Sequence, residues 1–181
     1  EQLVDMGIVR SLGMSNMTIT KLEQVLPLCR IKPVVLEVEI NPAFQQPKLF
    51  EYCIRHDILP VAFSPMGSPC RPERDTEEGD VVTFEMEELQ EIARAHHCHP
   101  AEICVKWAVQ RGHVPIPFSV YPEEYTGNLR CTTEDFLTDA EMEMLQKADR
   151  NARLIKGKVF LWESAESWRD IWDGEDESNN L

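Results

Sequence analysis

Short apolar runs alternate with amphipathic stretches along most of this chain, and this rhythm limits the folds open to it. The apolar runs have the length of buried strands and cover residues 8–14, 33–40, 58–63 and 114–116. The amphipathic stretches predict helices over residues 18–26, 46–56, 86–97, 101–111 and 123–129, with Thr18 as an N-cap. Strands and helices alternating at this interval are typical of βαβ units, so we expect an α/β fold with a parallel sheet.

The rhythm occurs four times, and a closed βα barrel needs eight strands. The chain of 181 residues also begins at Glu1, without an initiator methionine. We therefore expect half of a barrel that belongs to something longer.

The remaining segments have a different character. Residues 68–83 are polar and carry Pro69, Pro72 and Gly79, which predicts a long loop. A further helix is expected over 140–148, followed by an aromatic segment over 158–172 and a disordered acidic end over 174–181. We therefore divide the chain into a half-barrel over residues 1–150 and an aromatic loop with an acidic tail over residues 151–181.

Charge and cysteine content exclude several classes of function. The net charge is −14, and the densest charge run, residues 173–177, is acidic, so nucleic acid and anionic membranes are poor partners. No apolar run approaches the roughly 18 residues of a transmembrane helix. The six cysteines form no CxxC pair, which favours reduced thiols and a cytoplasmic location.

Four segments, each at the end of a predicted strand, carry a resemblance to a known family. They are residues 7–16 (GIVRSLGMSN), 37–42 (EVEINP), 62–68 (AFSPMGS) and 115–120 (PIPFSV). In this order they resemble the motifs that end barrel strands five to eight of the aldo-keto reductases. The resemblance implies the C-terminal half of an aldo-keto reductase-type (β/α)8 TIM barrel, and a nicotinamide cofactor, NADP or NAD, with a small carbonyl substrate as partners.

The resemblance also implies roles for individual residues, although each has a plainer structural interpretation. Ser15 and Asn16 match positions that hold the nicotinamide carboxamide, but they also suit a turn. Phe63 matches a stacking tyrosine, but it also suits a core. The other matching positions lie at Glu37 (for a glutamine beside the carboxamide), Ser64, Met66 and Ser68 (the pyrophosphate loop), and Ser119 and Asn128. Three aromatic residues of the tail fall on the substrate side, namely Phe160, Trp162 and Trp168.

Several positions depart from the family pattern. Phe118 and Glu124 stand where a lysine and an arginine contact the 2′-phosphate of NADPH, and a carboxylate there repels phosphate. Glu37 can accept a hydrogen bond from the carboxamide but cannot donate one. We therefore expect either a preference for NAD(H) or weak or lost cofactor binding.

The family's catalytic Asp, Tyr, Lys and His come from the first four strands and have no counterpart in this chain. Two hypotheses follow from the resemblance. One is an NAD(P)H-dependent oxidoreductase that reduces aldehydes or ketones and whose catalytic half is absent here. The other is a catalytically inactive scaffold that self-associates or joins a larger assembly through open barrel edges.

A metal site receives little support from the sequence. His96, His97, Cys98 and His99 are consecutive, and Cys104 follows in the next predicted helix. Structural zinc needs four converging ligands, usually in two short pairs, and this run offers no such pairing. We therefore predict no metal ligands.

Overall fold

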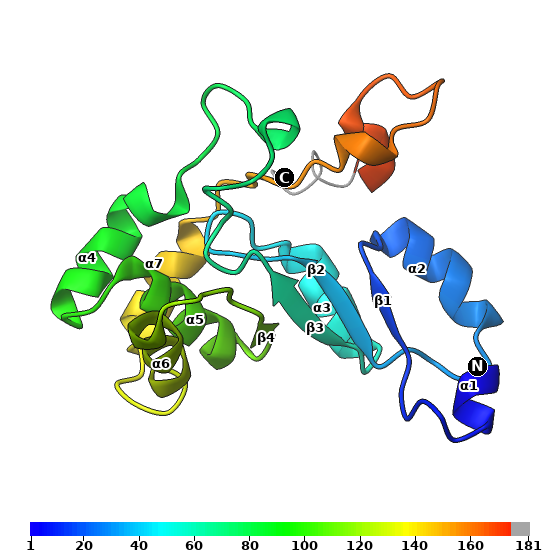
Figure 1. The fold of residues 1–181 in the computed structure, drawn as a ribbon, viewed down its shortest axis with the longest axis horizontal. Helices are drawn as coiled ribbons and strands as arrows, with labels where there is room; N and C mark the ends of the chain where they lie inside the picture. Colours follow the sequence, from blue (N-terminus) through cyan, green and yellow to red (C-terminus); the bar gives the residue numbers. More distant parts are fainter. Residues whose placement is uncertain (175–181) are drawn as a thin grey trace.

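The computed structural model describes residues 1–174, and its central feature is a four-stranded parallel sheet in the order β1-β2-β3-β4 (Figure 1). The strands are β1 (Gly13–Ser15), β2 (Val35–Glu39), β3 (Leu59–Phe63) and β4 (Val114–Pro115). The helices are α1 (Gln2–Asp5), α2 (Ile19–Val25), α3 (Pro47–Arg55), α4 (Glu87–Ala95), α5 (Pro100–Arg111), α6 (Pro122–Arg130) and α7 (Asp139–Lys147). The predicted α/β class and parallel sheet are confirmed.

The predicted strand over residues 8–14 is wrong in its extent. β1 covers only Gly13–Ser15, because its neighbour β2 begins at Val35, which pairs with Gly13. Residues 8–12 precede this register, and the contact of Leu12 with the segment before β2 is a single hydrogen bond from the Val34 amide to the Leu12 carbonyl, at 2.8 Å. The other predicted strands and helices lie within two residues of the observed ones.

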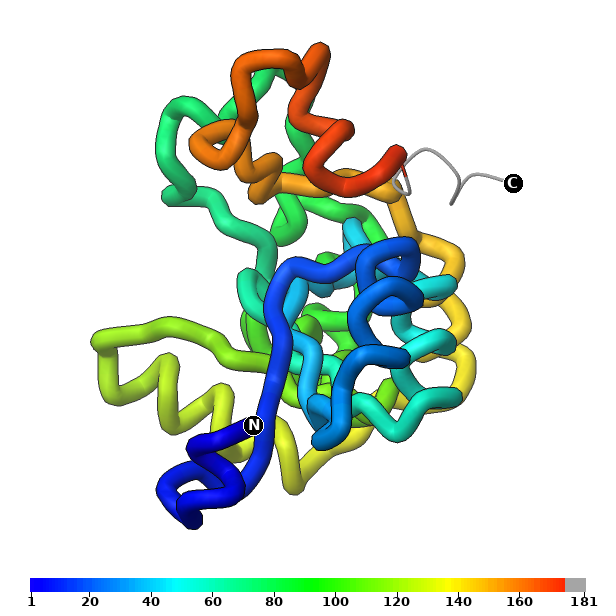
Figure 2. The backbone as a smooth tube through the Cα atoms, turned by 90° about the vertical axis from the view of Figure 1, so that its right-hand side faces the viewer, coloured from blue at the N-terminus to red at the C-terminus, as the bar shows by residue number. Residues whose placement is uncertain are grey.

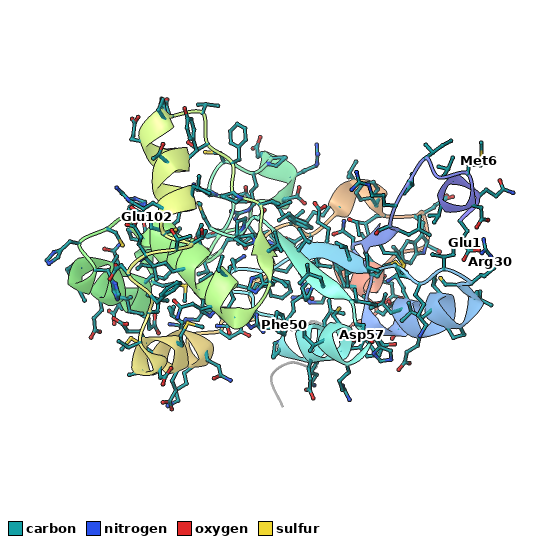
Figure 3. All side chains as sticks on the ribbon, turned by 90° about the horizontal axis from the view of Figure 1, so that it is seen from below. Glu1, Met6, Arg30, Phe50, Asp57 and Glu102 are labelled. Atoms are coloured by element: carbon teal, nitrogen blue, oxygen red, sulfur yellow. The ribbon has the colours of Figure 1, made fainter. Side chains whose placement is uncertain are left out.

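The sequence pattern also missed the short helix α1. Its position is fixed by ion pairs from Arg30 to Asp5, at 2.6 Å, and to Glu1, at 3.5 Å. Figure 3 shows Glu1 and Arg30 beside one another at this corner of the molecule. Side chains 25 to 29 positions apart hold α1, which is why local periodicity gives no sign of it.

Helix ends follow recognisable sequence signals. The Thr18 hydroxyl accepts a hydrogen bond from the Lys21 amide at 3.2 Å, which confirms the predicted N-cap of α2. α5 begins with a capping box formed by His99 and Glu102 and ends at Gly112, which adopts the left-handed conformation.

The hydrophobic core lies between the sheet and the helices on one of its faces. Leu36, Val38 and Ala62 point to this face and are at most 2% exposed. Residues that alternate with them along β2 and β3, such as Glu37 and Val61, face the other way and are half-buried. The sheet is therefore covered by helices on one face and open over much of the other.

The segment after residue 150 folds back over the carboxyl ends of the strands. Figure 2 shows it beside the loop that follows β3, at the same end of the molecule. Trp172 is buried here and its indole N–H donates to the Lys156 carbonyl at 3.0 Å. Lys21 of α2 reaches the end of this segment, with its ammonium 2.5 Å from the Asp173 carboxylate. The segment is thus fastened to both early and late parts of the fold.

The predicted division at residue 150 stays a prediction. The predicted disorder of the acidic end covers residues 174–181. Gly174 lies in a turn, and residues 175–181 lie outside the described residues. Among the described helices, none combines the length and apolar character needed to cross a membrane.

Candidate functional site

Three of the predicted site residues lie side by side where β1 ends. Ser15 pairs with Glu37 in the parallel ladder, and the Asn16 amide donates to the Glu37 carbonyl at 2.9 Å. The Asn16 side-chain amide donates to the Ser15 hydroxyl at 2.6 Å. Asn16 has a φ of +55°, which lets the chain turn sharply while the polar side chains stay at the strand end.

Phe63 lies on the same open face as Glu37. β3 pairs with β2 so that Val61 is beside Glu37 and Phe63 is beside Glu39. Residues directly opposite one another in a ladder project to the same face of the sheet. The half-buried Phe63 ring therefore stands on the face that carries Glu37, two residues further toward the carboxyl end of the strands.

Glu39 shows how this face is closed at its end. It is fully buried, and its carboxylate accepts hydrogen bonds from the amides of Leu154, at 3.0 Å, and Ile155, at 2.9 Å. Hydrogen bonds to a charged acceptor are stronger than neutral ones. Glu39 thus fixes the returning segment against the strand ends, a role that the sequence analysis did not assign to it.

A cleft of about 900 Å³ lies beyond the ends of β3 and β4, between the loop after β3 and the first turn of α6, and its lining does not include Ser15, Asn16, Glu37 or Phe63. Four predicted cofactor residues line it, namely Ser64, Met66, Ser68 and Asn128. Its apolar lining includes Phe84, Ile116, Phe118 and Ile155. The cleft has the size and mixed lining of a small-molecule site.

The loop that lines this cleft makes a tight turn. The hydroxyls of Ser64 and Ser68 are 2.6 Å apart, and the Gly67 amide donates to the Ser64 carbonyl at 2.9 Å. Gly67 has a φ of +73°, and a Cβ there would lie 2.3 Å from the Thr83 hydroxyl. Both conformation and space therefore require glycine at this position.

Carboxylates form the α6 side of the cleft. Glu102, Glu123 and Glu124 all line it. The predicted site residue Ser119 donates its hydroxyl hydrogen to the Glu124 carboxylate at 2.5 Å. Figure 3 shows Glu102 where α5 meets α6, and its carboxyl carbon lies 3.5 Å from the Cβ position of Gly127.

An ionic network holds the loop after β3 against the returning segment. Asp80 accepts from Arg71 at 2.5 Å and from Lys156 at 3.0 Å. Glu77 lies 2.8 Å from the ammonium of Lys156 and 2.7 Å from that of Lys158. These five side chains order a segment that the sequence predicted as a long loop.

The carboxylates of this network stay ionised to low pH. Burial raises the pKa of Asp80, but hydrogen bonds from the Glu77 amide, Lys156 and Arg71, together with the charge of Lys156, outweigh it and hold that pKa below its usual range. Hydrogen bonds from Lys156 and Lys158 lower the pKa of Glu77. Opposite charges at residues 77–80 and 156–158 were the one sequence signal that could have indicated the contact.

The three aromatic residues predicted on the substrate side lie apart from this cleft lining. Phe160 and Trp162 are exposed, and the half-buried Trp168 ring is covered by the Arg169 guanidinium at 4.5 Å. The buried aromatic residue of this segment is Trp172, with the Arg153 guanidinium 3.5 Å from its ring centroid. The substrate-side role of the first three stays a prediction.

The histidine and cysteine run is held by other contacts. His96 is bound between Asp135, at 2.8 Å, and Glu141, at 3.0 Å, while His99 caps α5. Burial lowers the pKa of His96, but the hydrogen bonds to the two carboxylates outweigh it and raise that pKa above its usual value. Within residues 1–174, no group of three or more His, Cys, Asp or Glu side chains is placed to hold a metal ion.

Comparison with known proteins links the fold to one family. The profile of the aldo/keto reductase family matches residues 1–150. The chain is 36% identical to the aldo/keto reductase slr0942 of Synechocystis sp., over 96% of this chain and 53% of that protein. It is 33% identical to aldo-keto reductase family 1 member A1-A of Danio rerio, over 94% of this chain and 51% of the relative.

A third relative has a name that includes its cofactor. The NADPH-dependent D-xylose reductase of Candida boidinii is 38% identical to this chain, over 84% of this chain and 48% of its own length. The chain thus spans about half the length of the curated relatives it matches.

Proposed function

Because the chain belongs to the aldo/keto reductase family, we propose that it supplies the nucleotide-binding part of an NAD(P)H-dependent oxidoreductase that reduces aldehydes or ketones. The observation that carries the proposal is the joint placement of the Ser15–Asn16–Glu37 cluster and the 900 Å³ cleft at one end of the sheet. In this proposal the chain corresponds to barrel strands five to eight, and the first four strands belong to the part of the family fold that it does not span.

The residues at the strand ends suit an extended dinucleotide. The cleft is large enough for a nucleotide and has hydroxyl groups on Ser64 and Ser68. Ser15, Asn16 and Glu37 place hydroxyl, amide and carboxylate groups together, as recognition of a planar carboxamide requires. The D-xylose reductase of Candida boidinii is NADPH-dependent by name.

Each residue has a defined part in this proposal. Asn16 can donate to and accept from the carboxamide, whereas Glu37 only accepts from its N–H. Phe63 offers an aromatic surface to the nicotinamide ring from the open face of the sheet. The nicotinamide, when bound, supplies a hydride to the carbonyl carbon of the substrate.

Turnover needs a proton donor that the described residues do not place here. The resemblance assigns it to a tyrosine of the catalytic Asp, Tyr, Lys and His set, which we propose lies on the remaining strands. Phe160, Trp162 and Trp168 would then face the substrate from the returning segment. The chain alone is therefore expected to bind the nucleotide without reducing a carbonyl.

The cysteines support a cytoplasmic location, because all six have free thiols: Cys29, Cys53, Cys70, Cys98, Cys104 and Cys131.

The open edges of the sheet support a second candidate function, that of a non-catalytic scaffold. β1 and β4 each pair on one side only within the described sheet. Ile116, Phe118 and Val120, which follow β4, are 44–87% exposed. Such edges favour pairing with a second copy or with a larger assembly.

Titration of the purified chain with NADH and NADPH, followed by nucleotide fluorescence, separates the two functions. We expect micromolar binding of at least one nucleotide, and tighter binding by Glu37→Gln, since glutamine adds a donor toward the carboxamide. Glu23→Gln, which changes an exposed carboxylate on α2, is the matched control and should leave affinity unchanged. No binding of either nucleotide at millimolar concentration would reject the proposal and leave the scaffold.

A further inference from the structure

Glu39 is a buried carboxylate that binds two successive amides of the returning segment. It is the last residue of β2 and is fully buried. Each of its oxygens takes one amide, since Oε1 accepts from Leu154 at 3.0 Å and Oε2 accepts from Ile155 at 2.9 Å. Buried amides need acceptors, and successive amides that share one anion fix the course of the backbone between them. The carboxylate therefore determines where residues 154 and 155 cross the end of the sheet.

The strand end that carries Glu39 is itself held in place. The Glu39 carbonyl accepts from the Gln46 side-chain amide at 2.6 Å, and Gln46 is buried at the N-terminus of α3. β3 pairs with β2 up to this point, where Phe63 lies beside Glu39. The carboxylate thus belongs to a fixed part of the sheet and can impose its position on the segment that returns to it.

The side chains of the two held residues reach the cleft by different routes. Ile155 is half-buried and lines the cleft of about 900 Å³ directly. Leu154 is buried, and its Cδ1 lies 3.5 Å from the Cβ position of Gly67, in the turn that also lines the cleft. A shift in the Glu39 contacts would therefore move one part of the cleft lining and loosen the packing behind another.

We propose that Glu39 is a positioning residue for the cleft, because it holds the backbone that carries Leu154 and Ile155. Glu39 is absent from the cleft lining, so its effect passes through the two amides that it binds. The inference rests on the proposed function and deepens it, since a nucleotide is the ligand proposed for this cleft. Its consequence is that nucleotide affinity depends on a carboxylate that the nucleotide does not touch.

The test is a pair of fluorescence titrations, with NADH and with NADPH, on the full chain and on Glu39→Gln. Glutamine keeps the size of the side chain but offers one acceptor and one donor, so it can hold one amide and directs an N–H at the other. Affinity for the nucleotide that the wild-type chain binds more tightly should fall about tenfold. Glu39→Asp keeps both acceptor oxygens on a shorter side chain and should show a smaller loss, which tests the inference if Glu39→Gln does not fold.

A matched variant separates positioning from stability alone. Glu141→Gln changes a carboxylate that also accepts a backbone amide, that of Thr138 at 2.7 Å, on α7 and outside the cleft lining. Both variants should unfold at lower urea concentration than the wild-type chain, but Glu141→Gln should leave the nucleotide affinity of the folded protein unchanged. An equal loss of affinity in the two variants would overturn the inference, because lost stability would then explain both.

A double variant shows whether Glu39 acts through Ile155. Ile155→Ala should weaken binding several-fold by removing apolar surface from the cleft, and Glu39→Gln should then cost much less affinity than it does in the wild-type chain. Losses that multiply, or an unchanged affinity in Glu39→Gln, would overturn the inference and leave the proposed function standing. Failure of the wild-type chain to bind either nucleotide would overturn the proposed function, and the inference with it.

Discussion

The two faces of the parallel sheet differ in what covers them and therefore in what they contribute. On one face, Leu36 and Ala62 are completely buried beneath helices. On the other, Val61 and Phe63 are half-buried, and close cover comes where residues 153–156 return over the strand ends. The covered face supplies most of the stability, while the open face and its ends present the groups that can meet a ligand.

Truncating one side chain on each face should reveal this difference as a large difference in the free energy of unfolding. Leu36→Ala should lower the free energy of unfolding by about 3 kcal/mol, because it leaves a cavity in a tightly packed core. Val61→Ala on the open face should cost about 1 kcal/mol or less, because its side chain already contacts solvent. Urea unfolding followed by circular dichroism measures both. Equal losses would mean that the open face is covered in solution.

Two glycines in the loop after β3 allow a tightly packed position near the strand ends to be compared with an open one. Gly67→Ala should lower the free energy of unfolding by about 2 to 3 kcal/mol, since it combines a left-handed conformation with a clash against Thr83. Gly79→Ala has a similar φ of +85° but open space around its Cβ position, and should cost about 1 kcal/mol. The difference between the losses in the two variants measures the cost of the clash with Thr83, because both glycines have similar φ values. Thr83→Ala should rescue part of the loss in Gly67→Ala and none of that in Gly79→Ala.

The ionic contacts on the two sides of the molecule should respond to pH with opposite signs. The pKa of His96 is raised in the fold, so its contribution to the free energy of unfolding is complete below the unfolded pKa of about 6.5. This contribution is lost as pH rises through the folded pKa. Asp80 and Glu77 have lowered pKa values in the fold, so their carboxylates stabilise it fully above their unfolded pKa values. This stabilisation is lost as pH falls through their folded pKa values. His96 bridges helices on the covered side, whereas Asp80 and Glu77 lie at the open end.

His96→Gln should therefore destabilise the chain by about 1 kcal/mol at about pH 5 and by less at about pH 8. Asp135 and Glu141 stay charged at the lower pH, because contacts with His96 help to lower their pKa values. Urea titrations of the wild-type chain and the variant at the two pH values measure the effect. A penalty that does not change with pH would assign His96 a packing role alone.

The sequence predicted the parallel sheet and most helices because their signals are local. The apolar runs and the Thr18 cap each act within a few residues. The extent of β1 was not predictable in this way, because it depends on where β2 begins. The short α1 depends on Arg30, which lies far along the chain from it.

The candidate site shows the same limit. The fold places Ser15, Asn16 and Glu37 at neighbouring positions and Ser64, Met66, Ser68 and Asn128 on one cleft, while their part in cofactor binding stays a prediction. The motifs gave no indication that Glu39 and Lys156 bind partners on distant segments. Such contacts depend on how the end of the chain returns to the sheet, and no periodicity encodes that path.

The carboxylate of Glu39 also sets an order of events during protein synthesis. Its partner at Leu154 lies 115 residues further along the chain. At about 5 to 20 residues per second, a ribosome needs roughly 6 to 23 seconds to add that length. Throughout that interval the Glu39 carboxylate must be hydrogen-bonded by water, because the amides of Leu154 and Ile155 are not yet present. Residues 154 and 155 therefore close the strand ends only after the whole sheet has been translated, and a chain interrupted before residue 154 leaves the Glu39 carboxylate without its two amide donors.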